Sequence, residues 1–189
     1  DDKYAARVGD DFLAVYDTET FTVLDKKPIK IDGIKDFSWS PDERNPLLAY
    51  WIPGTENNPA RVSLMQVPSR HIVRTKNLFN VTECRLHWHT EGDYLAVQIE
   101  RAGKSKKQLL NSVELFRVRV KDIPVEVVEL PASSDVLATA FEPSGSRLLI
   151  AYREEFKVNV AFYDLAHQDK TGSLTIRLLK VLERKQLSR

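Results

Sequence analysis

The sequence predicts an all-β chain built from a repeated unit of four short strands. Two observations and one general rule support this prediction. A large aromatic residue closes a short run at three places, Trp39, Trp88 and Phe141, and a turn followed by an apolar run comes after each. Each copy continues with two further runs that mostly alternate apolar and polar residues, which is the period of a half-buried strand. A four-stranded repeat of roughly 40–50 residues is typical of a blade of a β-propeller.

The repeats divide the chain in order. Residues 1–33 hold three runs, predicted to be the last three strands of one blade. Full blades are predicted at 34–78, 79–132 and 133–182, followed by a tail at 183–189. About three and a half blades would leave two wide unpaired edges if they stood alone, and propellers usually close with four or more. We therefore predict a fragment of a larger WD40-like β-propeller.

The end of the last blade permits two interpretations. Leucines between residues 174 and 182 fit the outer strand that the repeat requires, but their spacing also fits a helix. The repeat favours the strand over Leu174–Leu182, and the sequence does not decide whether the last seven residues are strand, helix or disordered.

The three repeated aromatic residues are predicted to have a structural role. Trp39, Trp88 and Phe141 occupy the same position in each copy, at the end of the first strand. Large aromatic side chains at such positions bury much apolar area. We expect them to pack in the core between neighbouring blades rather than to bind a ligand.

Nothing in the sequence predicts catalysis, a metal or a cofactor. The best metal-ligand candidates are Cys84, His87 and His89, but the alternation of a strand points Cys84 and His87 to opposite faces, and Cys84 is the only cysteine. No Gly-rich phosphate loop and no nucleophile motif is present. We predict a non-enzyme with no catalytic residues, no metal, no cofactor and no small-molecule substrate.

Charge is balanced over the chain, with 28 Lys and Arg against 27 Asp and Glu. A net charge of +1 gives no global attraction to nucleic acid or to an acidic membrane. The sequence contains no apolar run of 18 residues, so no transmembrane helix is expected. A single cysteine allows no disulfide within the chain, which suggests a reducing compartment.

One local basic segment stands out between the second and third strands of the second full blade. It carries Arg101, Lys104, Lys106 and Lys107, and the following strand and its exit add Arg117, Arg119 and Lys121. The segment is either a solubilising loop or a surface that contacts RNA phosphates, since clustered cations release counterions from nucleic acid. We take these four loop residues as the candidate contact to RNA or the ribosome.

Several segments resemble one known family. In order along nearly the whole chain they are LDKKPIKIDGIKDFSWSP, PARVSLMQVPS, NLFNV, GDYLAVQIER, DIPVEVVEL, FEPSGSRL and VAFYDL. Together they resemble the propeller of the b subunit of eukaryotic translation initiation factor three. The resemblance implies a WD-type propeller of about nine blades, of which this chain would be a part.

The resemblance also implies a function. It implies a cytoplasmic, non-catalytic scaffold subunit of the initiation factor complex, whose propeller docks on the small (40S) ribosomal subunit, on its protein and rRNA. It implies contacts with the a, g, i and j subunits, mostly through regions outside this chain. The alternative is a WD-repeat propeller that binds peptides or proteins outside translation.

Overall fold

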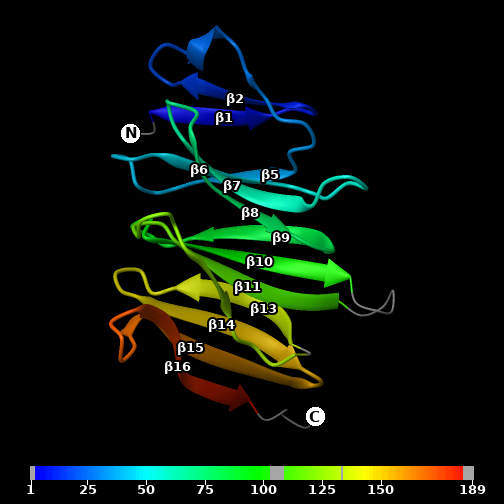
Figure 1. Ribbon diagram of the computed structural model, residues 1–189, viewed down its shortest axis with the longest axis vertical. Helices are drawn as coiled ribbons and strands as arrows, with labels where there is room; N and C mark the ends of the chain where they lie inside the picture. Colours follow the sequence, from blue (N-terminus) through cyan, green and yellow to red (C-terminus); the bar gives the residue numbers. More distant parts are fainter. Residues whose placement is uncertain (1–2, 103–108, 133, 185–189) are drawn as a thin grey trace. The chain divides into compact units, whose positions relative to one another are not determined.

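The computed structural model describes residues 3–102, 109–132 and 134–184. Over these residues the chain is almost entirely β-strand, with a single short 3-10 turn, η1 (Leu24–Lys26) (Figure 1). The strands form four-stranded antiparallel sheets, which confirms the predicted fold class. The chain divides into two compact units, Asp1–Val81 and Thr82–Arg189.

The first sheet of the first unit contains β1 (Tyr4–Val8), β2 (Phe12–Asp17), β3 (Thr22–Val23) and β4 (Ile29–Lys30). β1 pairs with one edge of β2, whereas β3 and β4 both pair with the other edge. The last of the three runs predicted within residues 1–33 is thus two short strands. Asp25 and Lys26 between them have φ of 54° and 59°, a left-handed backbone that cannot continue a strand.

The second sheet of this unit consists of β5 (Asp36–Trp39), β6 (Leu47–Ile52), β7 (Ala60–Gln66) and β8 (Ile72–Leu78), hydrogen-bonded in chain order. All six residues of β6 are buried, which explains its unbroken apolar sequence. Side chains of both sheets share one core. The core includes Leu13 and Val15 from β2, and Leu48, Tyr50 and Met65 from the second sheet.

The second unit repeats this arrangement in two sheets, in each of which strands that follow one another in the chain are hydrogen-bonded neighbours. One contains β9 (Val81–Trp88), β10 (Tyr94–Ala102), β11 (Leu109–Arg117) and β12 (Val125–Val128). The other contains β13 (Asp135–Phe141), β14 (Arg147–Glu154), β15 (Lys157–Gln168) and β16 (Leu174–Arg184). The segment that fitted both a strand and a helix is therefore the outer strand β16, as the repeat predicted.

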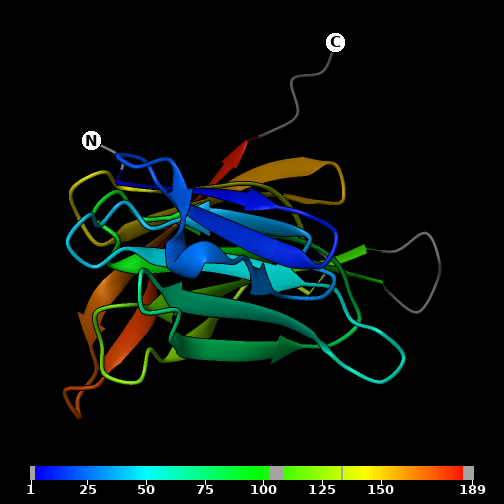
Figure 2. The ribbon, with the colours of Figure 1, turned by 90° about the horizontal axis from the view of Figure 1, so that it is seen from above.

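The core of the second unit lies between its two sheets. Alternate residues of β14 point into it, namely Leu148, Ile150 and Tyr152, and they meet Val113 and Leu115 of β11. Both ribbon views show the strands of each sheet running side by side (Figures 1 and 2). A meander of four antiparallel strands, packed face to face on a similar one, is the architecture of consecutive propeller blades.

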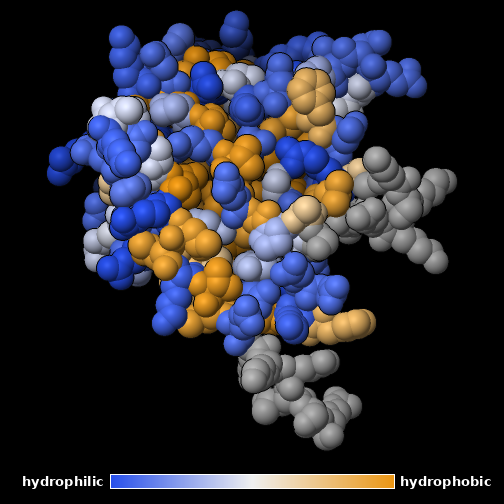
Figure 3. Space-filling model, turned by 60° about the horizontal axis from the view of Figure 1, so that its bottom comes forward, coloured by the Kyte–Doolittle hydropathy of each residue, from blue (hydrophilic) through white to orange (hydrophobic). Residues whose placement is uncertain are grey.

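The last strand exposes apolar side chains. Leu174, Leu178, Leu179 and Leu182 of β16 are each more than a third exposed. The face of the molecule seen in Figure 3, which lies on the side of β13–β16, carries broad apolar areas. Exposed apolar area of this extent is typical of surfaces that another part of a protein covers.

Candidate nucleic-acid interface

The predicted basic segment includes the residues between β10 and β11, two strands that pair antiparallel. Lys104, Lys106 and Lys107 lie outside the described residues. Arg101 is described and belongs to β10, opposite Leu110 of β11. Its guanidinium donates to Ser112 Oγ and lies 3.3 Å from Glu114 Oε1. The Glu114 side chain is only 6% exposed, so Arg101 neutralises a nearly buried carboxylate and is not a loop cation.

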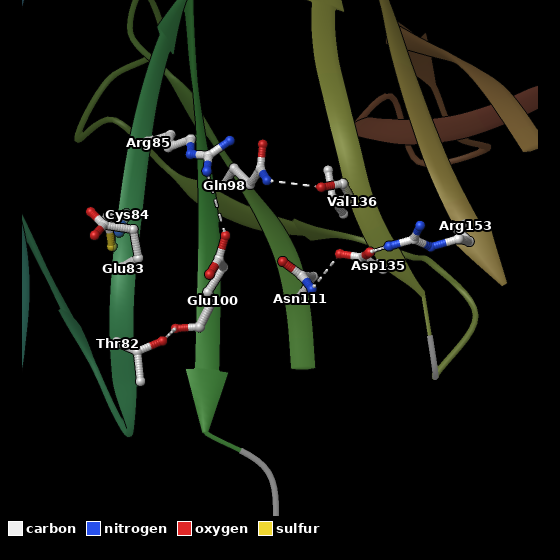
Figure 4. A network of polar contacts seen from close by, with 10 residues as sticks. All are labelled: Thr82, Glu83, Cys84, Arg85, Gln98, Glu100, Asn111, Asp135, Val136 and Arg153. Carbon is white, nitrogen blue, oxygen red and sulfur yellow. Dashed lines mark hydrogen bonds and ion pairs between the residues drawn. The ribbon is translucent and has the colours of Figure 1, made fainter. Parts of the chain in front are cut away.

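Two further arginines lie on other strands of the same unit. Arg85 of β9 lies 3.8 Å from Glu100 Oε1, and Arg153 of β14 pairs with Asp135 Oδ2. Both arginine side chains are more than half exposed. Figure 4 shows them on either side of a row of polar side chains. Neither arginine was predicted from the sequence, because the two come from strands that are far apart in the chain.

The polar row between these arginines ties the strands together. Gln98 Nε2 donates to the backbone oxygen of Val136 at 3.1 Å, and Gln98 is almost fully buried. Asn111 Nδ2 lies 3.4 Å from Asp135 Oδ1, the same carboxylate that pairs with Arg153 (Figure 4). These bonds join the two sheets of the unit, and buried hydrogen bonds of this kind hold strands in one arrangement.

The three arginines differ in how easily they could bind a phosphate. Exposed ion pairs contribute only about 0–1 kcal/mol, so Arg85 and Arg153 can exchange a carboxylate for a phosphate oxygen at small cost. Arg101 cannot, because its removal from Glu114 would leave a desolvated carboxylate without a counter-charge. The described part of this surface therefore offers two exchangeable cations.

The sequence left open whether the basic surface extends along β11, and the buried Arg117 does not extend it. Arg117 is 2% exposed, with Nε donating to Glu126 and Nη1 donating to the backbone oxygen of Leu165. β11 ends at Arg117, so the alternation that would have aligned it with Arg119 and Lys121 stops there. Arg119 instead bonds Asp93 Oδ1 at 3.0 Å and the backbone oxygen of Glu91 at 3.1 Å.

The repeated aromatic residues are half-buried rather than fully buried. Trp39 packs against the core of the first unit and Phe141 against that of the second. Phe141 stacks on Tyr94 with ring centroids 6.3 Å apart and meets the edge of His89 at 5.6 Å. Phe141 thus lies between the two sheets of its unit. Trp88, at the end of β9, is half-buried as well.

The candidate metal ligands are placed as ordinary sheet residues. Cys84 is buried on β9, and His89 forms ring contacts with Tyr94 and Phe141. Burial and the nearby charge of Arg85 lower the pKa of His87. Within residues 3–102, 109–132 and 134–184, no group of three His, Cys, Asp or Glu side chains is arranged to hold a metal ion.

Burial of Cys84 leads to a prediction about its reactivity. Burial raises the pKa of its thiol to about 12, and the carboxylate of Glu83 adds to the shift. Only the thiolate reacts with alkylating reagents, and at pH 8 its population falls by roughly 1000-fold when the pKa rises from 9 to 12. We expect iodoacetamide to modify the native chain at pH 8 far more slowly than the chain in denaturant. A native rate within tenfold of the denatured rate would contradict this burial.

The family of the chain follows from comparison with known proteins. Residues 76–181, more than half of the chain, match the family model described as eukaryotic translation initiation factor eIF2A. The chain belongs to this family. In the part of the chain that the structure describes, no helix is long and apolar enough to cross a membrane.

The most informative relatives of this family member share one name, that of the B subunit of eukaryotic translation initiation factor 3. The protein of Xenopus laevis is 41% identical over 98% of this chain, and that of Schizosaccharomyces pombe is 42% identical over 98%. The protein of Nicotiana tabacum is 49% identical over 77%. The chain spans 26%, 27% and 20% of these relatives, about a quarter of their length. The resemblance predicted from the sequence segments is thus confirmed.

Solved structures similar to this family member support the fold alone. The WD40 domain of Toxoplasma gondii coronin has a TM-score of 0.52 at 14% identity, covering 95% of this chain and 42% of that one. Hydrazine synthase of Kuenenia stuttgartiensis has a TM-score of 0.57 at 18% identity, covering 85% of this chain and 49% of that one. Together with the four-stranded sheets, they establish a partial WD40-like propeller.

Proposed function

We propose that this chain is part of a non-catalytic scaffold protein that acts in translation initiation and docks on the small ribosomal subunit. The observation that carries the proposal is its identity of 40% or more, over most of the chain, to the B subunits of initiation factor 3 from animals, plants and fungi. A location in the cytoplasm, and contacts with the a, g, i and j subunits, belong to the same proposal. These sister subunits would bind mostly through regions outside this chain.

The chemistry of the described residues supports a scaffold rather than an enzyme. The polar groups that the two sheets of the second unit bring together are ion pairs and hydrogen bonds between strands, as in the row around Asp135. Such contacts position strands, whereas a catalytic group needs access to a bound substrate.

The test of this proposal is co-purification. Tagged full-length protein would be recovered from a cytoplasmic extract of its own organism at low and at moderate salt. We expect small ribosomal subunits and other initiation factor subunits in stoichiometric amounts. Recovery of the full-length protein without either, at both salt concentrations, would overturn the proposal and favour a propeller that acts outside translation.

We further propose that the basic end of the second unit contacts ribosomal RNA through phosphates. Lys104, Lys106 and Lys107 carry this proposal, with the exchangeable Arg85 and Arg153 on strands of the same unit. Arg101, the fourth residue of the predicted contact, would act by holding Glu114 rather than by meeting a phosphate. Phosphate contacts fix position without reading sequence, so no preference for an RNA sequence is expected.

Salt dependence measures the number of such contacts. Changing Lys104, Lys106 and Lys107 to Ser in the full-length protein should weaken binding to purified small subunits and flatten the plot of log affinity against log salt. Three lost contacts correspond to a change of roughly 2–3 in that slope. The matched control changes three exposed lysines elsewhere, Lys27, Lys35 and Lys170, to Ser. Equal slopes for both variants would show that the loop lysines only solubilise the hairpin.

A further inference from the structure

One end of the first unit contains a hollow beside an exposed aromatic ring. The hollow has a volume of about 420 Å³ and lies between the β6–β7 loop (cyan in Figure 1) and the Phe79–Asn80 turn that follows β8. Its eleven lining residues include Glu56, Asn58 and Ala60 on one side and Leu78, Phe79 and Asn80 on the other. A volume of this size accepts one or two side chains of a partner.

The walls of the hollow are held in place by backbone geometry. Thr55 N donates to the backbone oxygen of Asn58 at 2.8 Å, and Asn58 N donates to Thr55 Oγ1 at 3.2 Å. A Cβ on Gly54 would lie 3.0 Å from the backbone nitrogen of Ala60, a tight approach that a larger residue could make only if this backbone shifted. Ala60 and Leu78 pair across β7 and β8 and form a buried apolar floor.

The Phe79 ring lies at the edge of this hollow. Its side chain is 70% exposed, and the next residue, Asn80, has φ of 56°, a left-handed conformation that Asn tolerates better than most residues. Exposing a phenyl ring forfeits roughly 2 kcal/mol of burial, which a partner would recover. Aromatic side chains next to small pockets are common anchors of protein interfaces.

The charge of the hollow favours one class of partner. Glu56 is the one charged residue among the eleven that line it, and Thr55, Asn57, Asn58 and Asn80 supply polar groups that can bond a peptide backbone. RNA-binding grooves combine aromatic rings with cations along the backbone path, and no lining residue is cationic. A carboxylate and amides beside an apolar floor instead suit a peptide with an apolar side chain next to a Lys or Arg.

We infer that the hollow beside Phe79 binds an extended segment of a basic protein, with an apolar side chain against Phe79, Leu78 and Ala60 and a cationic side chain at Glu56. The inference deepens the proposed function and rests on it, because the partner is expected within initiation complexes on the small ribosomal subunit. It assigns a protein contact to the first unit, distinct from the phosphate contacts proposed for the second.

A photo-crosslinking residue in place of Phe79 tests the class of partner. Full-length protein with p-benzoylphenylalanine at position 79 would be assembled with purified small subunits and initiation factor subunits and irradiated. We expect adducts that survive ribonuclease and map to a peptide with an apolar residue beside Lys or Arg. Phe21 is the matched control position, because its ring is 84% exposed on a turn that lines no part of this hollow. Adducts to RNA, or no adduct above that of position 21, would overturn the inference.

Two substitutions test the contacts themselves. Phe79→Ser should weaken assembly about tenfold, as removal of an interface anchor does, and Glu56→Lys should weaken it by reversing the charge. Phe21→Ser and Glu19→Lys are the matched controls, because both residues lie in the turn between β2 and β3. Both controls should leave the affinity of assembly unchanged. If the unaltered full-length protein does not assemble, the proposed function is wrong. If the unaltered protein assembles, and Phe79→Ser and Glu56→Lys assemble with the same affinity as their controls, only this inference is wrong.

Discussion

Replacement of Arg117 by Met should lower the free energy of unfolding of the second unit by about 2–4 kcal/mol, because it leaves a buried carbonyl without its donor and a partly buried carboxylate without its counter-charge. Arg117 is 2% exposed and joins three strands, because it ends β11, donates to Glu126 on β12 and donates to the backbone oxygen of Leu165 on β15. Methionine keeps much of the volume but none of the donors. The buried carbonyl of Leu165 and the carboxylate of Glu126 would both lose their partner.

The control for this experiment is an arginine whose own side chain is exposed. Arg177 lies 3.3 Å from Asp164 on the same unit, and its side chain is about half exposed. Arg177→Met should change stability by less than about 1 kcal/mol, as exposed pairs do. Urea unfolding followed by hydrogen exchange on β11 and β15 measures both variants in the full-length protein. A loss below about 1 kcal/mol for Arg117→Met would show that its contacts to β12 and β15 do not stabilise the unit.

A double substitution separates the two partners of Arg117. Adding Glu126→Gln to Arg117→Met removes the unpaired carboxylate but leaves the Leu165 carbonyl without a donor. Glu126 is 30% exposed, so water solvates part of its charge. We expect the double variant to recover only part of the lost stability, because the buried Leu165 carbonyl remains without its donor. Stability equal to that of Arg117→Met alone would place the whole cost at the Leu165 carbonyl.

The repeat in the sequence predicted the strands because each blade meets the same requirement. A blade buries one set of alternating side chains against its neighbour, so aromatic, turn and apolar positions recur at fixed offsets. β5–β8 and the two sheets of the second unit follow that pattern. The third run of the first sheet does not, because the left-handed Asp25 and Lys26 interrupt it, and the sequence carries no glycine there to signal this.

The candidate interface was less predictable because it depends on contacts between distant segments. Arg101 and Arg117 looked alike as cations next to a loop, but each meets a carboxylate that another part of the sheet supplies, Glu114 and Glu126. Arg85 and Arg153, both exposed, are on different sheets of the second unit and come near the same polar row only when the two sheets pack together. Local composition predicts that a loop is basic, but pairing across strands decides which cations remain exchangeable.

Among the repeat positions, leucine rather than the aromatic residue should control stability. The copies align Leu95 with Leu148, and both are fully buried, whereas Trp88 at the aromatic position is half-buried. Leu148 lies in the core between the two sheets of the second unit, where truncation leaves a cavity that packed strands cannot close. We therefore expect the leucine position to contribute more to stability than the aromatic position, the reverse of what the aromatic pattern suggests.

Leu148→Ala should lower the free energy of unfolding by about 2–5 kcal/mol, the range for leucines in closed cores. Trp88→Ala should cost less, about 1–2 kcal/mol, because this residue is only partly buried. Val127→Ala on β12 is the control, since that side chain is 59% exposed and its loss should cost within about 0.5 kcal/mol. Urea unfolding of the three variants in the full-length protein, with hydrogen exchange on β10 and β14, ranks them. A larger loss for Trp88→Ala than for Leu148→Ala would mean that the aromatic position, and not the leucine, holds the two sheets together.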